Sequence, residues 1–234
     1  MREEETVSIH LYFHLHVPTQ AFEFQKYTVI VQLSRRSSRL PLTLTTMRRA
    51  YAKFSKKTSL ISLPVNLGQP LLGPDRSPSL LMENGLLSML GSLGWQVIQV
   101  PDIINSTAMT YTDQTSITPK AKNCAQVGQI CHKIYEQLAE HAATDNFLLI
   151  LGGDHCIPIG TIPAIVKHRP STGVVWVDAH ADINSPQTTM SGNMHGMPVS
   201  FLLNEVQNVK SLPSMSWFNP PYLKPRDIVY VGLR

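Results

Sequence analysis

Short apolar runs alternate along the chain with longer stretches in which apolar residues recur every three or four positions. The short runs, typical of strands buried in a parallel sheet, lie at residues 60–65, 95–100, 147–151, 173–177 and 227–231. The stretches with helical spacing lie at residues 78–90, 123–142, 158–167 and 198–209. This alternation predicts a three-layer α/β/α fold with a mostly parallel sheet.

The first 59 residues do not follow this pattern, and no helical or strand periodicity is assigned to them. No Asp or Glu occurs between Phe24 and Pro74, while the positive charges of the chain concentrate there. We therefore expect residues 1–59 to form an N-terminal extension, either disordered or similar to a transit peptide, and residues 60–234 to form the folded domain. The basic, acid-free run from Met47 matches a mitochondrial transit peptide, and a basic disordered arm is the alternative. Whether translation starts at Met1 or Met47 stays open.

The composition gives no indication of nucleic-acid binding, a membrane-spanning helix or a disulfide framework. The net charge of +4 comes from this local excess, so it does not indicate nucleic-acid binding. No apolar run approaches the ~20 residues of a membrane-spanning helix, so no membrane partner is expected. Three cysteines at unrelated spacings argue against a disulfide framework and favour an intracellular location, mitochondrial or cytoplasmic. Cys156 is interpreted as a small core residue rather than a nucleophile.

The run at residues 173–177 leads directly into three potential metal ligands. Asp178, His180 and Asp182 are spaced i, i+2, i+4, and in an extended segment this spacing turns all three side chains to one side. Burying two carboxylates with an imidazole is costly unless a cation or a hydrogen-bond network compensates. A solvated acidic loop is the alternative, but such strict alternation after a buried strand favours a metal site.

A second apolar run ends in the same way. Residues 147–151 are followed by Gly152, Gly153, Asp154 and His155, and the glycine pair permits a tight turn at the end of the strand. Open α/β sheets gather their ligands at the carboxyl ends of strands, so His155 is expected near the Asp-x-His-x-Asp segment. Imidazole and carboxylate ligands without thiolates favour Mn, Fe(II) or Zn.

Taken together, these motifs resemble the arginases of the ureohydrolase family. The resemblance rests on Gly-Gly-Asp-His at residues 152–155, Asp-Ala-His-Ala-Asp at 178–182, Ser-Gly-Asn-Met-His at 191–195 and the segment 227–234. It is strong over residues 147–234, weaker over 60–141 and absent before residue 60. It implies an arginase-like α/β domain that hydrolyses L-arginine to L-ornithine and urea with manganese, as in arginine catabolism and the urea cycle.

The resemblance also implies a role for individual residues. His155 and Asp182 would bind one manganese ion, His180 the other, and Asp178 would bridge the two ions. Two such divalent ions would lower the pKa of a water molecule and so help it attack the guanidinium carbon. His195 would act as the catalytic proton shuttle. The α-carboxylate of arginine would be held by Asn184, Ser191 and Asn193.

The end of the chain departs from the family pattern. Arginases carry a second aspartate cluster on a later strand and an acid just after the Gly-Leu-Arg segment, and both would follow Arg234. We therefore expect a shortened arginase-like chain with its C-terminal strands missing, weak metal binding and weak activity. Another ureohydrolase such as agmatinase, or a non-catalytic arginase-like chain, is the alternative. The Ser191 and Asn193 positions favour arginine, because agmatine has no carboxylate. A homo-oligomer is compatible with this reading.

Overall fold

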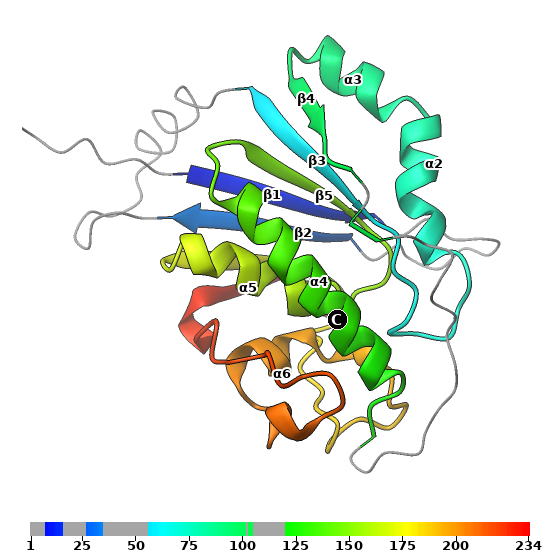
Figure 1. Ribbon diagram of the computed structural model, residues 1–234, viewed down its shortest axis with the longest axis vertical. Helices are drawn as coiled ribbons and strands as arrows, with labels where there is room; N and C mark the ends of the chain where they lie inside the picture. The colour runs from blue at the N-terminus through cyan, green and yellow to red at the C-terminus, as the bar shows by residue number, and fades with distance from the viewer. Residues whose placement is uncertain (1–7, 16–26, 35–55, 102, 105–119) are drawn as a thin grey trace, which may run out of the picture.

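The computed structural model describes two backbone strands at residues 8–15 and 27–34, and describes residues 56–101, 103–104 and 120–234 together with their side chains. Its first sheet has the order β4-β3-β5. The strands are β3 (Lys57–Leu63), β4 (Gln96–Gln99) and β5 (Phe147–Gly152), and both neighbouring pairs are parallel. Figure 1 shows β3 and β5 running side by side, with β4 at the outer edge. The parallel strands predicted for this region are confirmed.

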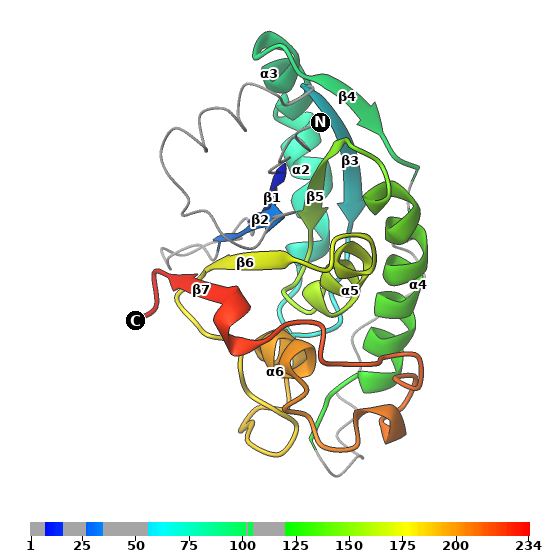
Figure 2. The same cartoon turned by 90° about the vertical axis from the view of Figure 1, so that its left-hand side faces the viewer.

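Helices cover both faces of this first sheet. On one face, Leu148 and Ile150 of β5 pack in a core shared with helices α4 (Cys124–Ala142) and α5 (Pro158–His168). On the other face, Phe147, Leu149 and Leu151 pack beneath α2 (Ser77–Glu83) and α3 (Leu86–Ser92). Figure 2 shows α4 lying along one side of the strands. Because successive side chains of a strand point to opposite faces, an apolar run such as β5 requires cover on both sides. The predicted three-layer α/β/α fold is confirmed.

A second sheet has the order β1-β2-β6-β7. Strands β6 (Thr172–Val177) and β7 (Ile228–Val231) are parallel neighbours. The antiparallel pair β1 (Ser8–Leu15) and β2 (Tyr27–Ser34) joins β6 through antiparallel pairing at the end of β2. Strand β1 also lies alongside β5, so the hairpin sits between the two groups of parallel strands (Figure 1).

These two hairpin strands correct the reading of the N-terminal segment. The expectation that no strand occurs before residue 60 is wrong at residues 8–15 and 27–34. Apolar and polar residues do alternate there, as at Ile9, Leu11 and Phe13, which is the pattern of a half-buried strand. The rest of the extension, residues 1–7, 16–26 and 35–55, and most of the loop before α4, residues 105–119, lie outside the described residues. The domain boundary near residue 60 stays a prediction.

Two predicted helices are shorter than expected. The helix expected at residues 78–90 is divided into α2 and α3 at Gly85, whose φ of 87° is left-handed and interrupts the helix. The helix expected at residues 198–209 is α6 (Pro198–Leu203), which ends because Asn204 adopts a left-handed conformation at its C-cap. Short 3-10 turns complete the described part at Pro74–Arg76, Met194–Gly196, Val209–Ser211 and Pro225–Asp227. Among the described helices, none combines the length and apolarity needed to cross a membrane.

Candidate metal centre

The turn after β5 is built by close contact with the end of β3. The amide of Gly153 donates to the carbonyl of Leu63 at 3.0 Å, and the amide of Asp154 donates to the carbonyl of Val65 at 2.8 Å. A Cβ atom at Gly153 would overlap the Val65 carbonyl, so only glycine allows the two chain segments to approach this closely. This turn directs His155 toward the end of β6.

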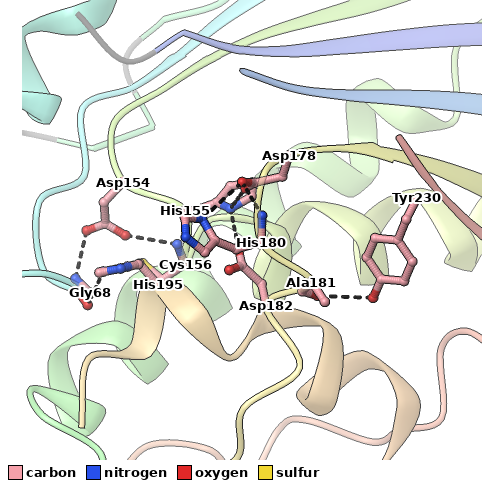
Figure 3. Close-up of polar contacts among 10 residues, drawn as sticks. All are labelled: Gly68, Asp154, His155, Cys156, Asp178, His180, Ala181, Asp182, His195 and Tyr230. Atoms are coloured by element: carbon pink, nitrogen blue, oxygen red, sulfur yellow. Dashed lines mark hydrogen bonds and ion pairs between the residues drawn. The ribbon is translucent and has the colours of Figure 1, made fainter. Parts of the chain in front are cut away.

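Three of the predicted ligands converge at the carboxyl ends of β5 and β6. The Nδ1 atom of His155 lies 2.5 Å from Oδ2 of Asp182 and 3.3 Å from Oδ2 of Asp178. Their potential ligand atoms all lie within 4.8 Å of one another. The exposed fractions are 6% for His155, 3% for Asp178 and 5% for Asp182, so the cluster is buried. Figure 3 shows the three side chains together. Each side chain can offer one ligand atom to a shared cation.

The backbone after β6 is not the extended segment that the sequence analysis assumed. Oδ1 of Asp178 accepts the amide of His180 at 2.9 Å, which turns the chain directly after the strand. Asp182 then adopts a φ of 48°, in the left-handed region that few residues other than glycine occupy. The expectation that all three side chains share one side through strand alternation is therefore wrong. Asp178 and Asp182 meet because the chain folds back.

His180 lies at the rim of the cluster instead of inside it. Its side chain is 44% exposed, and its Nδ1 atom lies 3.5 Å from Oδ1 of Asp178. Figure 3 shows the ring beside Asp178, on a different side of that carboxylate from His155. Asp178 consequently stands between the buried imidazole and the exposed one.

The buried cluster fits a divalent cation. Oδ2 of Asp178 is buried and accepts no hydrogen bond from the part of the chain that the structure describes; only the ion-pair contact with Nδ1 of His155 at 3.3 Å compensates its burial among those residues. A cation between the carboxylates and His155 would satisfy this oxygen. One imidazole and two carboxylates are ligands that suit manganese, iron(II) or zinc, and the absence of a thiolate among them disfavours softer metals.

Neighbouring strands and helices hold the ligand loop in place. The amide of Asp178 donates to the carbonyl of Val231 at 3.0 Å, and the carbonyl of Asp182 accepts the amide of Val199 at 3.0 Å. The hydroxyl of Tyr230 donates to the carbonyl of Ala181 at 3.0 Å. Burial, and secondly the charge of Asp182, raise the pKa of Tyr230, so the hydroxyl keeps the proton that it donates. The loop is thereby fixed from both sides.

The remaining predicted site residues lie on the segment that follows. His195 is half-buried, and its Nδ1 atom lies 3.1 Å from the carbonyl oxygen of Gly68. Asn184 and Ser191 are exposed, and Ser191 Oγ accepts the amide of Asn193 at 3.2 Å. Oδ1 of Asn193 is buried without a hydrogen-bond partner among the described residues. Ser191 and Asn193 are thus in contact, whereas Asn184 meets this segment through its amide, which donates to the carbonyl of Gly196.

Cys156 agrees with its interpretation as a core residue. Its side chain is fully buried, and a hydrogen bond with Cys131, burial and the charge of Asp154 all raise the pKa of its thiol. A thiol held in its protonated form is a poor nucleophile. The proximity of Cys156 to His155 in the sequence therefore has no catalytic meaning.

Asp154, Gly68 and Tyr230 were not predicted from the sequence as site residues, although all three form hydrogen bonds that hold the segments of the site in place. Asp154 lies inside the Gly-Gly-Asp-His motif, in which only His155 was predicted to be a ligand. Gly68 lies in a loop that is far from His195 in sequence, and Tyr230 lies on a strand with no ligand of its own. Of the three, Asp154 carried the clearest signal in the sequence, because it adjoins a predicted ligand.

Known proteins with similar sequences and structures are arginases. Residues 56–234 match the family model described as the Arginase family. Arginase-1 of Homo sapiens is 38% identical over 183 residues, which cover 77% of this chain and 55% of that protein. The native structure of arginase from Bacillus caldovelox is similar with a TM-score of 0.65 and 31% identity, over 77% of this chain and 58% of that one.

A further similar structure is that of Entamoeba histolytica arginase in complex with L-ornithine. Its TM-score is 0.61 and its identity 30%, over 76% of this chain and 58% of that one. The chain thus spans little more than half the length of the relatives that it matches. The match to the family model covers most of the chain and includes every predicted site residue. The chain belongs to the arginase family.

Proposed function

We propose that the chain is an arginase-type hydrolase that converts L-arginine and water to L-ornithine and urea with manganese. The observation that carries this proposal is the buried convergence of His155, Asp178 and Asp182, with one carboxylate oxygen left without a hydrogen bond. Family membership supports the reaction class, and the ornithine complex of the Entamoeba histolytica enzyme supports a small amino-acid ligand.

In this proposal the four ligands comprise two buried residues, one exposed residue and one carboxylate that lies between them. His155 and Asp182 would hold one manganese ion and His180 the other, and Asp178 would be shared between them, which fits its contacts with both imidazoles. Bound manganese supplies the activation of the water that attacks the guanidinium carbon. The protein contributes the burial of the carboxylates and the fixed loop that keeps them together.

His195 is proposed to move the proton that the reaction requires. A carbon–oxygen bond forms at the guanidinium carbon, and the bond from this carbon to the side-chain nitrogen of ornithine breaks. The leaving nitrogen needs a proton, and an imidazole is suited to deliver it near neutral pH. His195 is half-buried and hydrogen-bonded through Nδ1, so its ring has a defined orientation for this transfer.

The substrate is proposed to be held at its amino-acid end by Asn184, Ser191 and Asn193. Hydroxyl and amide groups can donate hydrogen bonds to a carboxylate. Ser191 and Asn193 lie on the same turn, which precedes His195. This arrangement would favour arginine over agmatine, which lacks the carboxylate.

Urea release from arginine and from agmatine, with and without manganese, tests the proposal. We expect weak, manganese-dependent release from arginine, less from agmatine, and none from Asp178→Ala. Asp145→Ala removes an exposed carboxylate outside the cluster and is the matched control. A preference for agmatine would identify another ureohydrolase, and no release from either compound would indicate a non-catalytic member of the family.

For the location, we propose that a chain started at Met47 enters the mitochondrion, on the composition of the basic and acid-free run that begins there. A chain started at Met1 would carry this run internally, after the strands at residues 8–15 and 27–34, and would stay in the cytoplasm. Residues 47–59 fused to a fluorescent protein test this. Import that is lost when Arg48 and Arg49 are replaced by Glu supports the proposal. A cytoplasmic fusion protein contradicts it.

A further inference from the structure

Asp154 is buried beside the metal centre, but its carboxylate is directed at the backbone. Oδ2 accepts the amides of Leu67 and Gly68, both at 2.7 Å, and Oδ1 accepts the amide of Cys156 at 2.9 Å. Its exposed fraction is 4%. A buried carboxylate that accepts several backbone amides is firmly held, and it holds those amides in turn. Asp154 therefore fixes the loop at residues 67–68 against the turn that carries His155.

The same loop contacts His195. The carbonyl oxygen of Gly68 accepts the backbone amide of His195 at 3.1 Å and lies 3.1 Å from its ring Nδ1 atom. A carbonyl can only accept a hydrogen bond, so Nδ1 must donate. In the neutral imidazole this assigns the proton to Nδ1 and the lone pair to Nε2. Gly68 thus selects both the tautomer and the orientation of the ring.

Gly68 is enclosed between Asp154 and His195. A Cβ atom at this position would lie 2.7 Å from Oδ1 of Asp154, 3.0 Å from Cβ of Cys156 and 3.0 Å from the backbone nitrogen of His195. Ordinary Cβ contacts are longer than this, so the loop leaves no room for a side chain. Figure 3 shows Asp154, Gly68 and His195 in this order. A displacement at Asp154 would therefore reach His195 directly.

We propose that Asp154 is a positioning residue for His195: through Gly68 it holds the imidazole in the Nδ1-protonated tautomer with a fixed ring orientation. The consequence for catalysis rests on the proposed function, in which His195 delivers a proton. The tautomer itself is a property of the protein without metal or substrate. It can consequently be measured whether or not the chain hydrolyses arginine.

The test is nitrogen NMR of the His195 ring, compared between wild type and Asp154→Asn in the metal-free chain. The spectra are recorded well above the ordinary imidazole pKa of about 6.5, and His195→Gln identifies the signals. Asn keeps the shape of Asp but presents an NH2 group that cannot accept the backbone amides. We expect a single Nδ1-protonated form in wild type and a mixture of tautomers in the variant. An unchanged His195 tautomer in a folded Asp154→Asn protein would overturn the proposal.

Thr58→Val is the matched control, because it removes a buried hydrogen bond between β3 and β5 without touching the contacts of Asp154. Its hydroxyl donates to the carbonyl of Phe147 at 3.0 Å, at the opposite end of these strands. We expect this variant to keep the wild-type His195 signals. Equal changes in both variants would show general loosening and overturn the proposal. Gly68→Ala perturbs the contact between Gly68 and His195 directly, and it replaces Asp154→Asn if that variant does not fold. We expect a mixture of His195 tautomers in this variant as well. An unchanged tautomer in a folded Gly68→Ala protein would overturn the proposal.

A kinetic comparison adds the functional consequence. If wild type releases urea, Asp154→Asn should lower kcat by about tenfold or more with a smaller change in KM, because general acid catalysis by a positioned side chain contributes about 10²–10⁴-fold and a misoriented ring loses part of it. An unchanged kcat would overturn the catalytic part of the inference. Failure of the wild type to release urea counts against the proposed function, while the NMR comparison still decides the role of Asp154.

Discussion

The Nδ1 atom of His155 lies 2.5 Å from Oδ2 of Asp182, although 27 residues separate them in the sequence. His155 follows β5 and Asp182 follows β6, so this contact joins the ends of strands from two different sheets. The imidazole also packs against Trp176, with ring centroids 4.8 Å apart. The positions of His155 and Asp182 are therefore determined by β5 and β6, and the buried carboxylate of Asp178 also contacts His155.

The turn at Gly153 should be intolerant of any side chain. Gly153→Ala would drive a Cβ atom into the Val65 carbonyl, and we expect a loss of about 3 kcal/mol in the free energy of unfolding. Gly91→Ala is the control, because Gly91 lies exposed in α3 with open space around it, and alanine should stabilise that helix by about 0.5–1 kcal/mol. Chemical denaturation measures both. Equal stability of the two variants would contradict the geometry of this turn.

The sequence was sufficient to predict the parallel strands and the residues at their ends. Phe147 to Leu151 and the run before Asp178 are long enough and apolar enough to require burial on both faces, so the strand ends and their ligands follow. His155, Asp178 and Asp182 could be grouped for that reason alone. Local periodicity carries this information without any knowledge of distant contacts.

Other features depend on contacts that no local pattern encodes. The carboxylate of Asp178 accepts the amide of His180, and Asp182 adopts a left-handed φ, so the chain changes direction in this segment, in which His180 lies at the rim. The contact between Gly68 and His195 joins residues 127 positions apart. The strands β1 and β2 did carry an alternating pattern, in which His10 and His14 occupy polar positions of β1.

The hairpin of β1 and β2 should contribute to the fold, in contrast to a dispensable extension. Deleting residues 1–34 removes both strands and exposes an edge of β6, which would lower the melting temperature and promote aggregation. Deleting residues 1–7 leaves both strands intact and is the control. Thermal denaturation and size-exclusion chromatography compare the two proteins. Identical melting of the longer deletion and the full chain would show that the hairpin is not needed.

The cysteines should resist alkylation in the folded protein. Burial, and secondly the nearby Cys131, raise the pKa of Cys124 from 9.0 to about 12, and that of Cys156 is also raised. A raised thiol pKa lowers the thiolate fraction, so labelling by iodoacetamide at about pH 8 should be slow and should not follow the titration of an ordinary thiol. Unfolding in guanidinium chloride should restore rapid labelling, as mass spectrometry can determine. Rapid labelling of Cys156 in the native state would contradict its assignment to the core.

His180 should matter only for the second manganese ion. Its ring is exposed and contacts Asp178, while the buried cluster holds His155 and Asp182. His180→Ala should therefore retain one binding event and lose the other in calorimetric titration with manganese. The exposed His168→Ala serves as the control for removal of an imidazole elsewhere. Complete loss of binding in His180→Ala would place this residue in the primary site.

Manganese binding to the buried cluster is the most direct test of the account as a whole. Titration of the 234-residue chain, followed by calorimetry and by the electron paramagnetic resonance of free manganese, should show saturable binding. Asp178→Ala should weaken it by at least about tenfold, since it removes the carboxylate that is proposed to contact both ions. Asp145→Ala should bind like wild type. Equal affinities for wild type and Asp178→Ala would mean that His155, Asp178 and Asp182 do not form a metal centre.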